Sequence, residues 1–424
     1  MSADSDKRLP LYLLAGFGVG AGLGLLVRGI GLSTEIPLQV ANLAGEIFLR
    51  GIFMLILPLV VPMLLLGIQQ LSETGAMGRV GWRAFWAIIG LTAIAAAIGL
   101  TLAKLFQPGA TLSPAAQAQL LARFSTETLP QKHLSAAYIL SLLPTNPFRE
   151  VAMAFTPQQE GGLLAVVTFV LLFGIALARL PREETQSFYR LLEVVYKASL
   201  WLLIQIMRWI APLGVAGLVF KAVVGLGWEL FPLLGRYVAT VGVGLLVQLI
   251  AVYSLFVWLF ARRSPIQMLR ESSPAILMAF SSASSNATLP TTLRVATERL
   301  KIAPPIAQFI VTLGATVNQN GTALYEGVTL LFLMQVFGVP LTFGEQIGVV
   351  GLAMLIAIGA AGVPGGSLPL LAGVLPLFGV PSGAIALIYG IDRFLDMLRT
   401  TLNVYGDLVI AAYLNRSYDG VSTD

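Results

Sequence analysis

The sequence predicts an all-α membrane protein that crosses the bilayer many times. Of its 424 residues, 57% are hydrophobic and only 11% are charged, and the mean hydropathy is +0.84. Soluble domains carry about 25% charged residues, so most of this surface must face lipid. Apolar runs of about 20 residues, each long enough to span a bilayer, recur along the chain. This pattern excludes a soluble enzyme, and the runs are too long for strands of an outer-membrane barrel.

Basic residues set the orientation of the ordinary spans. Clusters at Lys7–Arg8, Arg79–Arg83, Arg179–Arg182 and Arg262–Arg270 fall on one side if each apolar segment crosses once. Positively charged loops stay inside, so both termini are expected in the cytoplasm, with the protein in the inner (plasma) membrane. The six segments are Leu11–Val27, Ile47–Ile68, Phe85–Phe106, Leu163–Leu180, Leu191–Val224 and Leu233–Phe260.

The net charge and the rare residue types exclude other classes. The net charge is +5, but the basic residues flank apolar segments, which favours membrane orientation over nucleic-acid binding. The chain has no cysteine and a single histidine, His133, which is expected in an interfacial loop. Disulfides, cysteine-ligated metals and histidine-based catalysis are therefore not expected.

The apolar segments of the second half are interrupted. Their breaks contain serine, asparagine, glycine and proline, and broken backbone at membrane depth survives only where it is buried in protein or lines a cavity. We interpret the segments 276–293 and 347–378 as re-entrant hairpins. For 276–293, the alternative is a serine-rich loop at the membrane surface. Together they predict a binding site near mid-membrane. The segments are 276–293 (broken at 281–290), 306–337 (at 318–322), 347–378 (at 362–367) and the long polar helix 385–414.

One face of that last helix carries a stripe of polar residues. At about 100° per residue they fall within an arc of about 80°, with Thr400 at its edge. Charges inside apolar helices are costly and mark a pathway or a binding site, although a structural ion-pair network is the alternative. The stripe consists of Asp392, Asp396, Arg399, Asn403 and Asp407.

Two members of the stripe suggest the ligand. Arg399 offers a planar fork suited to a carboxylate, and Asp396, one turn earlier, suits an ammonium group. Asn403 and the hairpin amides near Ser285 are candidates for the α-carboxylate, because helix N-termini offer free N–H groups. The stripe therefore predicts an acidic amino acid as substrate.

The chain resembles the glutamate transporter family of dicarboxylate/amino acid:cation symporters over essentially its whole length. Such a resemblance implies a homotrimer in which each subunit has eight spans and two hairpins built as inverted repeats. It further implies that a scaffold (1–72 and 130–225) holds a transport domain (78–129 and 226–416) that moves like an elevator. The motifs are Gly78–Gly81, Pro144–Phe148, Ser284–Pro290, Asn318–Glu326, Ala361–Gly365 and Asp392–Asp407.

The resemblance also implies roles for individual residues. Asp396 would bind the amino group and Arg399 the side-chain carboxylate, within a substrate site of Ser285, Thr322, Val363, Asp396, Arg399, Thr400 and Asn403. One sodium site would use Gly314, Asn318, Asn403 and Asp407, and a second would use backbone carbonyls near Thr316, Ala357, Ile358 and Ala360. No cofactor is expected beyond the coupling ions Na⁺ and H⁺.

Departures from the family pattern concern the coupling ion. Asn320 replaces an aspartate that binds a third sodium ion in relatives, and Ile88 and Leu91 replace its tyrosine and threonine partners, leaving only Thr92. A neutral amide does not offset a buried cation, so this site is expected to be absent or weak. Reduced sodium stoichiometry, or proton coupling, is the resulting hypothesis.

Glu326 is the candidate proton carrier, because it matches the glutamate that carries the proton in excitatory transporters. A structural, hydrogen-bonded carboxyl group is the alternative.

Other function classes also remain. A substrate-gated anion channel would line its pore with rings of like charge, and an intramembrane enzyme has no matching motif here. Among substrates, a C4-dicarboxylate would leave Asp396 unpaired, and a neutral amino acid would leave Arg399 unpaired.

Overall fold

The computed structural model describes residues 3–30, 35–73, 79–113, 117, 120, 140, 143–153, 162–360 and 366–419, and every regular element in that part of the chain is helical. Four helical stretches in it are long and apolar enough to cross a membrane: Tyr12–Ile30, Glu35–Gln69, Val80–Phe106 and Arg182–Ala261. Two shorter apolar helices add to them, Ala165–Leu177 and Phe343–Ile358. The predicted all-α membrane class is therefore confirmed. His133 and Val363 lie outside the described residues.

Helices α1, α2 and α3 are longer than the apolar segments that predicted them, whereas α7 ends before the predicted segment does. A helix extends past its apolar run because the backbone hydrogen bonds continue into the polar ends. The helical stretch Arg182–Ala261 turns at Gly227, whose positive φ of 59° is a conformation that glycine adopts readily. The elements are α1 (Ala3–Ile30), α2 (Glu35–Glu73), α3 (Arg79–Phe106), α6 (Pro147–Met153), α7 (Gly162–Leu177), α8 (Arg182–Gln205), α9 (Ala211–Leu226), α10 (Leu230–Val247) and α11 (Ser254–Phe256).

Most helices of the second half are shorter, and the breaks between α12 and α13 and between α14 and α15 fall within the predicted polar interruptions. The interruption predicted at 362–367 lies largely outside the described residues. Helix α12 packs against α13, and α16 packs against α17. The long helix α18 carries the predicted polar stripe. The elements are α12 (Pro265–Ser282), α13 (Ser285–Arg294), α14 (Pro304–Val317), α15 (Asn320–Val336), α16 (Phe343–Gly359), α17 (Ser367–Val374) and α18 (Ala386–Asp419).

The first hairpin turn is tighter than the polar run 281–290 predicts. Only Ala283 and Ser284 separate α12 from α13, and Ala283 is left-handed with a φ of 47°. Ser284 caps α13, because its Oγ accepts a hydrogen bond of 3.3 Å from the backbone N–H of Ala287. The cap explains why the remaining polar residues of the run begin a helix rather than form a loop.

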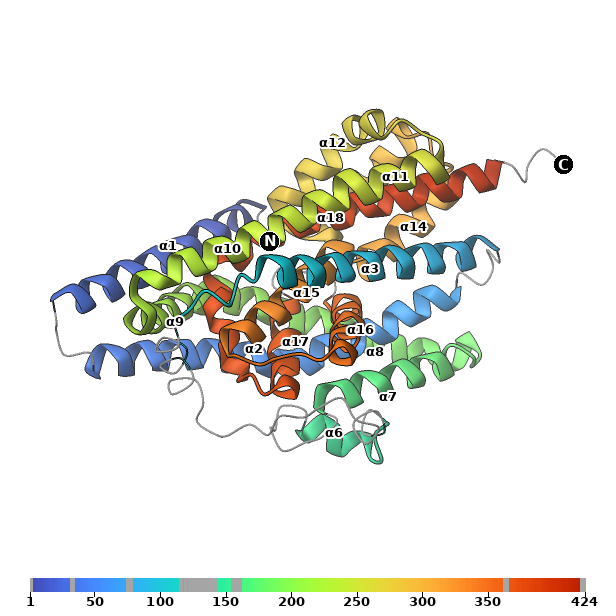
Figure 1. Cartoon of the computed structure of the whole chain (residues 1–424). Helices are drawn as coiled ribbons and strands as arrows, with labels where there is room; N and C mark the ends of the chain where they lie inside the picture. Colours follow the sequence, from blue (N-terminus) through green and yellow to red (C-terminus); the bar gives the residue numbers. More distant parts are fainter. Residues whose placement is uncertain are drawn as a thin grey trace.

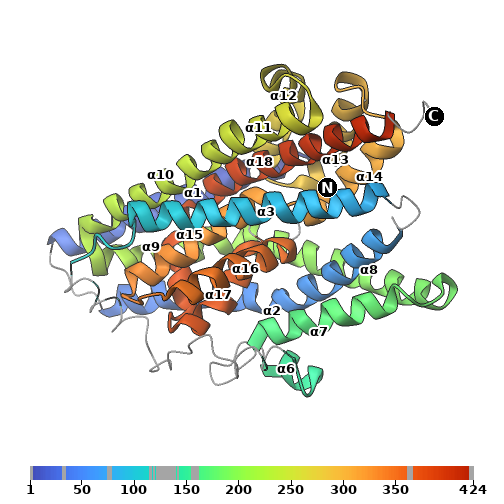
Figure 2. The same ribbon diagram turned by 45° about the vertical axis from the view of Figure 1, so that its right-hand side comes forward.

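Helix α18 lies where the packing groups meet. Helices α1 and α2 pack against α9, and α2 also packs against α7 and α8. Helix α15 packs against α3 and α16, while α18 packs against α12, α14 and α15 and also touches α1 and α9. Figures 1 and 2 show α3 and α15 side by side and α18 running next to α11 and α10. The polar stripe is therefore enclosed by protein on several sides.

Helices α1 and α9 approach closely at a glycine. A Cβ added at Gly20 would lie 2.3 Å from the carbonyl oxygen of Ala216, whereas a Cβ added at Gly22 would meet nothing within 4 Å. Such close backbone contact is how helices associate in lipid, where the hydrophobic effect contributes little.

We therefore expect Gly20→Ala to destabilise the protein by about 1–3 kcal/mol, the usual cost of overpacking. Gly22→Ala is the matched control on the same helix, and it should be neutral or slightly stabilising, because alanine favours helix more than glycine does. Thermal unfolding of both purified variants in detergent measures the difference. Equal stabilities would contradict the contact.

Candidate functional site

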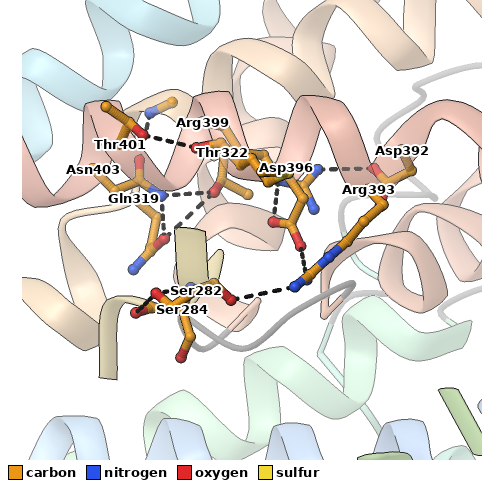
Figure 3. A network of polar contacts seen from close by, with 12 residues as sticks. Ser282, Ser284, Gln319, Thr322, Asp392, Arg393, Asp396, Arg399, Thr401 and Asn403 are labelled. Carbon is orange, nitrogen blue, oxygen red and sulfur yellow. Dashed lines mark hydrogen bonds and ion pairs between the residues drawn. The ribbon is translucent and has the colours of Figure 1, made fainter. Parts of the chain in front are cut away.

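A buried cluster of ion pairs lies in the middle of α18. The Nη1 of Arg399 donates to Oδ1 of Asp392 at 3.2 Å, and its Nε donates to Oδ1 of Asp396 at 3.0 Å. The guanidinium also lies over the ring of Tyr325 on α15, with 4.3 Å between Cζ and the ring centroid. Arg399 is 2% exposed, and both aspartates are 3% exposed. Figure 3 shows the three side chains next to one another on the helix. The two residues predicted to bind substrate are thus adjacent and fully enclosed.

Arg393 also belongs to this cluster, and the sequence analysis missed it. Its Nη1 pairs with Oδ2 of Asp396 at 3.5 Å, and its Nη2 donates to the carbonyl of Ser282 at 3.3 Å. At about 100° per residue, Arg393 lies roughly 40° beyond the edge of the predicted stripe. The spacing of three residues between Arg393 and Asp396 was the available signal.

Asn403 connects α18 to the break between α14 and α15. Its Oδ1 accepts a 2.7 Å hydrogen bond from the backbone N–H of Gly321. Its Nδ2 donates to Oγ1 of Thr322 at 3.1 Å and to Oε1 of Gln319. Gly321 has no room for a side chain, because a Cβ would lie 2.6 Å from the carbonyl oxygen of Arg399. The structure therefore joins Asn403 to Thr322 and places the backbone of Arg399 against Gly321.

The other predicted substrate residues occupy different positions relative to this cluster. Ser285 begins α13 and is 2% exposed, and its Oγ has no hydrogen-bond partner among the described residues. Thr400 is 5% exposed and follows Arg399 on α18. The Ser285 hydroxyl is therefore an available donor or acceptor near the turn that Arg393 contacts.

Asp407 belongs to the predicted first sodium site. Within the described residues, it forms no ion pair with a cationic side chain. Oδ1 of Asp407 accepts a 2.8 Å hydrogen bond from Nδ2 of Asn318, and the Oδ1 of Asn318 is buried without a partner in that part of the chain. A Cβ at Gly314 would lie 2.1 Å from Oδ1 of Asp407, so only glycine allows this approach. Carboxylate and amide oxygens of this kind suit a hard cation.

The predicted second sodium site lies between two helices that pack together. Thr316 is half-buried near the end of α14, and Ala357, Ile358 and Ala360 lie at the end of α16. Helices α14 and α16 are in contact. The end of a helix leaves backbone carbonyls unpaired, which is the kind of ligand that this site requires.

Asn320 is held by neutral hydrogen bonds. Its Oδ1 lies 2.6 Å from the hydroxyl of Thr92 on α3, and its Nδ2 donates to the hydroxyl of Tyr253 at 2.8 Å. Ile88 and Leu91 are buried in the apolar core nearby on α3. The amide therefore has a hydrogen-bond partner on each side.

Glu326 is fully enclosed on α15. Its exposed fraction is 0%, and neither carboxyl oxygen has a hydrogen-bond partner among the described residues. Arg399 and Asp392 act on it electrostatically. This differs from the alternative of a hydrogen-bonded structural carboxyl group.

Within the described ranges, no group of three or more His, Cys, Asp or Glu side chains is arranged to hold a metal ion.

Comparison with known proteins gives the same family over nearly the whole chain. The chain is 31% identical over 414 residues to the proton/sodium-glutamate symport protein of Bacillus subtilis (strain 168), covering 97% of this chain and 94% of that protein. It is 31% identical to the proton/glutamate-aspartate symporter of Escherichia coli (strain K12), covering 87% and 84%. It is 32% identical to the human neutral amino acid transporter B(0), covering 97% and 80%.

A family model described as the sodium:dicarboxylate symporter family matches residues 9–417. The match includes the α12–α13 hairpin, the broken helix α14–α15 and the polar stripe of α18. We conclude that the chain belongs to the sodium:dicarboxylate symporter family, and so is a membrane transporter and not an enzyme.

Proposed function

We propose that the protein is a secondary active symporter that carries aspartate or glutamate into the cell together with cations. The observation that supports this most is the buried contact of Arg399 with Asp396. An acidic amino acid supplies one carboxylate for the guanidinium and one ammonium group for the aspartate, so it can satisfy both charges. The names of the bacterial relatives, which are glutamate and aspartate symporters, agree with this substrate.

A neutral amino acid is the weaker candidate, although one relative carries that name. Its side chain offers no carboxylate to the guanidinium of Arg399, which is 2% exposed. The arginine therefore favours acidic substrates.

The proposed architecture has eight spans and two re-entrant hairpins, α12–α13 and α16–α17, with inverted repeats. The scaffold consists of residues 1–72 and 130–225, and the transport domain consists of 78–129 and 226–416. The close packing of α1 and α2 against α9, and of α3 against α15, supports this division. Three subunits would join through their scaffolds, and the transport domains would slide across the inner membrane like elevators, with both termini in the cytoplasm.

Within that transport domain, we assign the substrate site to Ser285, Thr322, Val363, Asp396, Arg399, Thr400 and Asn403. The first sodium ion would bind Gly314, Asn318, Asn403 and Asp407, and the second would bind near Thr316, Ala357, Ile358 and Ala360. The neutral side chain of Asn320, which forms hydrogen bonds with Thr92 and Tyr253, supports a reduced number of sodium ions. The unpartnered carboxyl group of Glu326 supports a proton as a second coupling ion.

The proposal is tested by uptake of labelled aspartate and glutamate into proteoliposomes under an inward sodium gradient, an inward proton gradient, both and neither. We expect accumulation above equilibrium in at least one gradient and equilibration without a gradient. Uptake by protons alone would assign the coupling to Glu326 or another carboxyl group, and a strict need for sodium would assign it to the Asp407 site. No concentrative uptake in any gradient would reject symport.

Replacing Arg399 by Gln should reduce aspartate uptake at least a hundredfold, because the side-chain carboxylate loses a charge-assisted, bidentate partner. Competition by a neutral amino acid such as serine should increase at the same time, since the positive charge that favours an acidic side chain is gone. Arg416→Gln on the exposed end of α18 is the control and should keep the wild-type preference. If Arg399→Gln still prefers aspartate over serine, Arg399 does not bind the substrate.

Replacing Glu326 by Gln should make uptake independent of pH, because glutamine keeps the shape of the side chain but cannot load or release a proton. The measurement is the initial rate of aspartate uptake between pH 5.5 and 8.5. The control is Glu229→Gln, which changes an exposed glutamate at the turn between α9 and α10 and should keep the wild-type profile. An unchanged pH profile in Glu326→Gln would remove its role as proton carrier.

A further inference from the structure

The side-chain amide of Gln319 lies against two residues of the proposed substrate site. Its Oε1 accepts a hydrogen bond from Nδ2 of Asn403 and another, of 3.4 Å, from the hydroxyl of Thr322. Figure 3 shows the three side chains next to one another. Gln319 and Asn403 are each 2% exposed, and Thr322 is 4% exposed. One uncharged oxygen atom inside the protein therefore accepts a hydrogen bond from each of these two residues.

The side chain of Asn403 has no further donor to offer. Its amide carries two N–H groups, and Nδ2 donates both to Gln319 and, at 3.1 Å, to Oγ1 of Thr322. Its Oδ1 accepts from the backbone N–H of Gly321. A carboxylate that binds to Nδ2 of Asn403 must therefore replace one of these acceptors. The amide oxygen of Gln319 is the acceptor most like a carboxylate oxygen, because both are bonded to a planar carbon.

The other end of the Gln319 amide is held by α14. Its Nε2 donates to the backbone carbonyl of Ala315 at 3.0 Å. Ala315 is one of the last four residues of α14, whose carbonyls have no partner within the helix. The amide nitrogen is thus bound to α14 while the amide oxygen is bound to α18. The side chain of Gln319 can therefore keep the first contact when it loses the second.

Deepening the proposed function, on which it rests, we propose that Gln319 is a specificity-determining residue that competes with the α-carboxylate of the substrate for the donors of Asn403 and Thr322. When aspartate binds, its α-carboxylate accepts these hydrogen bonds, and Oε1 of Gln319 moves away from Asn403. Breaking the internal hydrogen bonds costs free energy, so Gln319 weakens the binding of aspartate. A ligand without an α-carboxylate leaves Gln319 in place and does not bear that cost.

The alternative is that Gln319 only positions Asn403 and Thr322 for the substrate. The two roles predict opposite effects when the amide is removed. Loss of a positioning residue weakens the binding of aspartate, because the donors are no longer held in place. Loss of a competitor strengthens it, because the donors are released for the α-carboxylate.

The test uses proteoliposomes that exchange internal aspartate for external labelled aspartate, with the same sodium concentration and pH on both sides. The measured quantity is the aspartate concentration that gives half-maximal exchange. In Gln319→Met, which keeps the length of the side chain but has no amide, this concentration should fall about threefold to tenfold, the effect of one net hydrogen bond. Gln308→Met makes the same change at an exposed residue of α14 and should leave it unchanged.

Inhibition of this exchange by β-alanine shows whether the effect depends on the α-carboxylate. β-Alanine has the ammonium group and the side-chain carboxylate of aspartate but no α-carboxylate. The ratio of its inhibition constant to the half-saturating aspartate concentration should rise at least threefold in Gln319→Met and stay constant in Gln308→Met. If Gln319 only positions its neighbours without competing, the half-saturating aspartate concentration does not fall.

Thermal unfolding in detergent checks that each variant is folded. If Gln319→Met does not fold, a cryo-EM structure of the wild type with saturating aspartate decides. We expect an α-carboxylate oxygen within hydrogen-bond distance of Nδ2 of Asn403, and Oε1 of Gln319 beyond that distance.

A folded Gln319→Met with an equal or higher half-saturating aspartate concentration would overturn the proposal. So would an aspartate-bound wild type in which Gln319 still accepts from Asn403. Both outcomes would leave the proposed symport of acidic amino acids intact, since the wild type still binds aspartate in them. A wild type that exchanges no aspartate would instead overturn the proposed function, and the role of Gln319 with it.

Discussion

The compensation of buried charge in α18 is the constraint on which the rest of the site depends. Charged groups inside a membrane protein are expensive, and each needs a partner or a neutral form. Arg399 is held between Asp392 and Asp396 and over the ring of Tyr325. These contacts require α15 to lie directly against α18, which in turn requires a residue without a side chain at Gly321. The packing of the surrounding helices thus follows from the need to enclose these charges.

The breaks in the helices provide polar backbone where the charged side chains need it. The break between α14 and α15 presents the N–H of Gly321 to Asn403, and the turn between α12 and α13 presents the carbonyl of Ser282 to Arg393. Exposed to lipid, such unpaired backbone groups would cost several kcal/mol each. Because they are buried against α18, they bring polar groups from three separate segments to one place.

The side chains around the proposed ion positions are of two kinds. The Asp407 site combines a carboxylate with a buried, unpartnered amide oxygen, so it is prepared for a cation. The Asn320 side chain is neutral and is hydrogen-bonded to Thr92 and Tyr253. This difference supports the proposal of transport with fewer sodium ions, in which Glu326 is the proposed proton carrier.

The sequence by itself determined the membrane class, the places where the helices break and the polar face of α18, because hydropathy and helical periodicity are local properties of the chain. The family could also be identified from the sequence, because each of its motifs is a short run of neighbouring residues. Only the tertiary structure decided which charges are paired. Arg393 lies off the predicted stripe, yet it reaches Asp396 and the α12–α13 turn, since its long side chain bridges helices that are 111 residues apart at Ser282. Likewise, the partners of Asn320 come from α3 and the segment after α10, and no local pattern links residues separated by such distances along the chain.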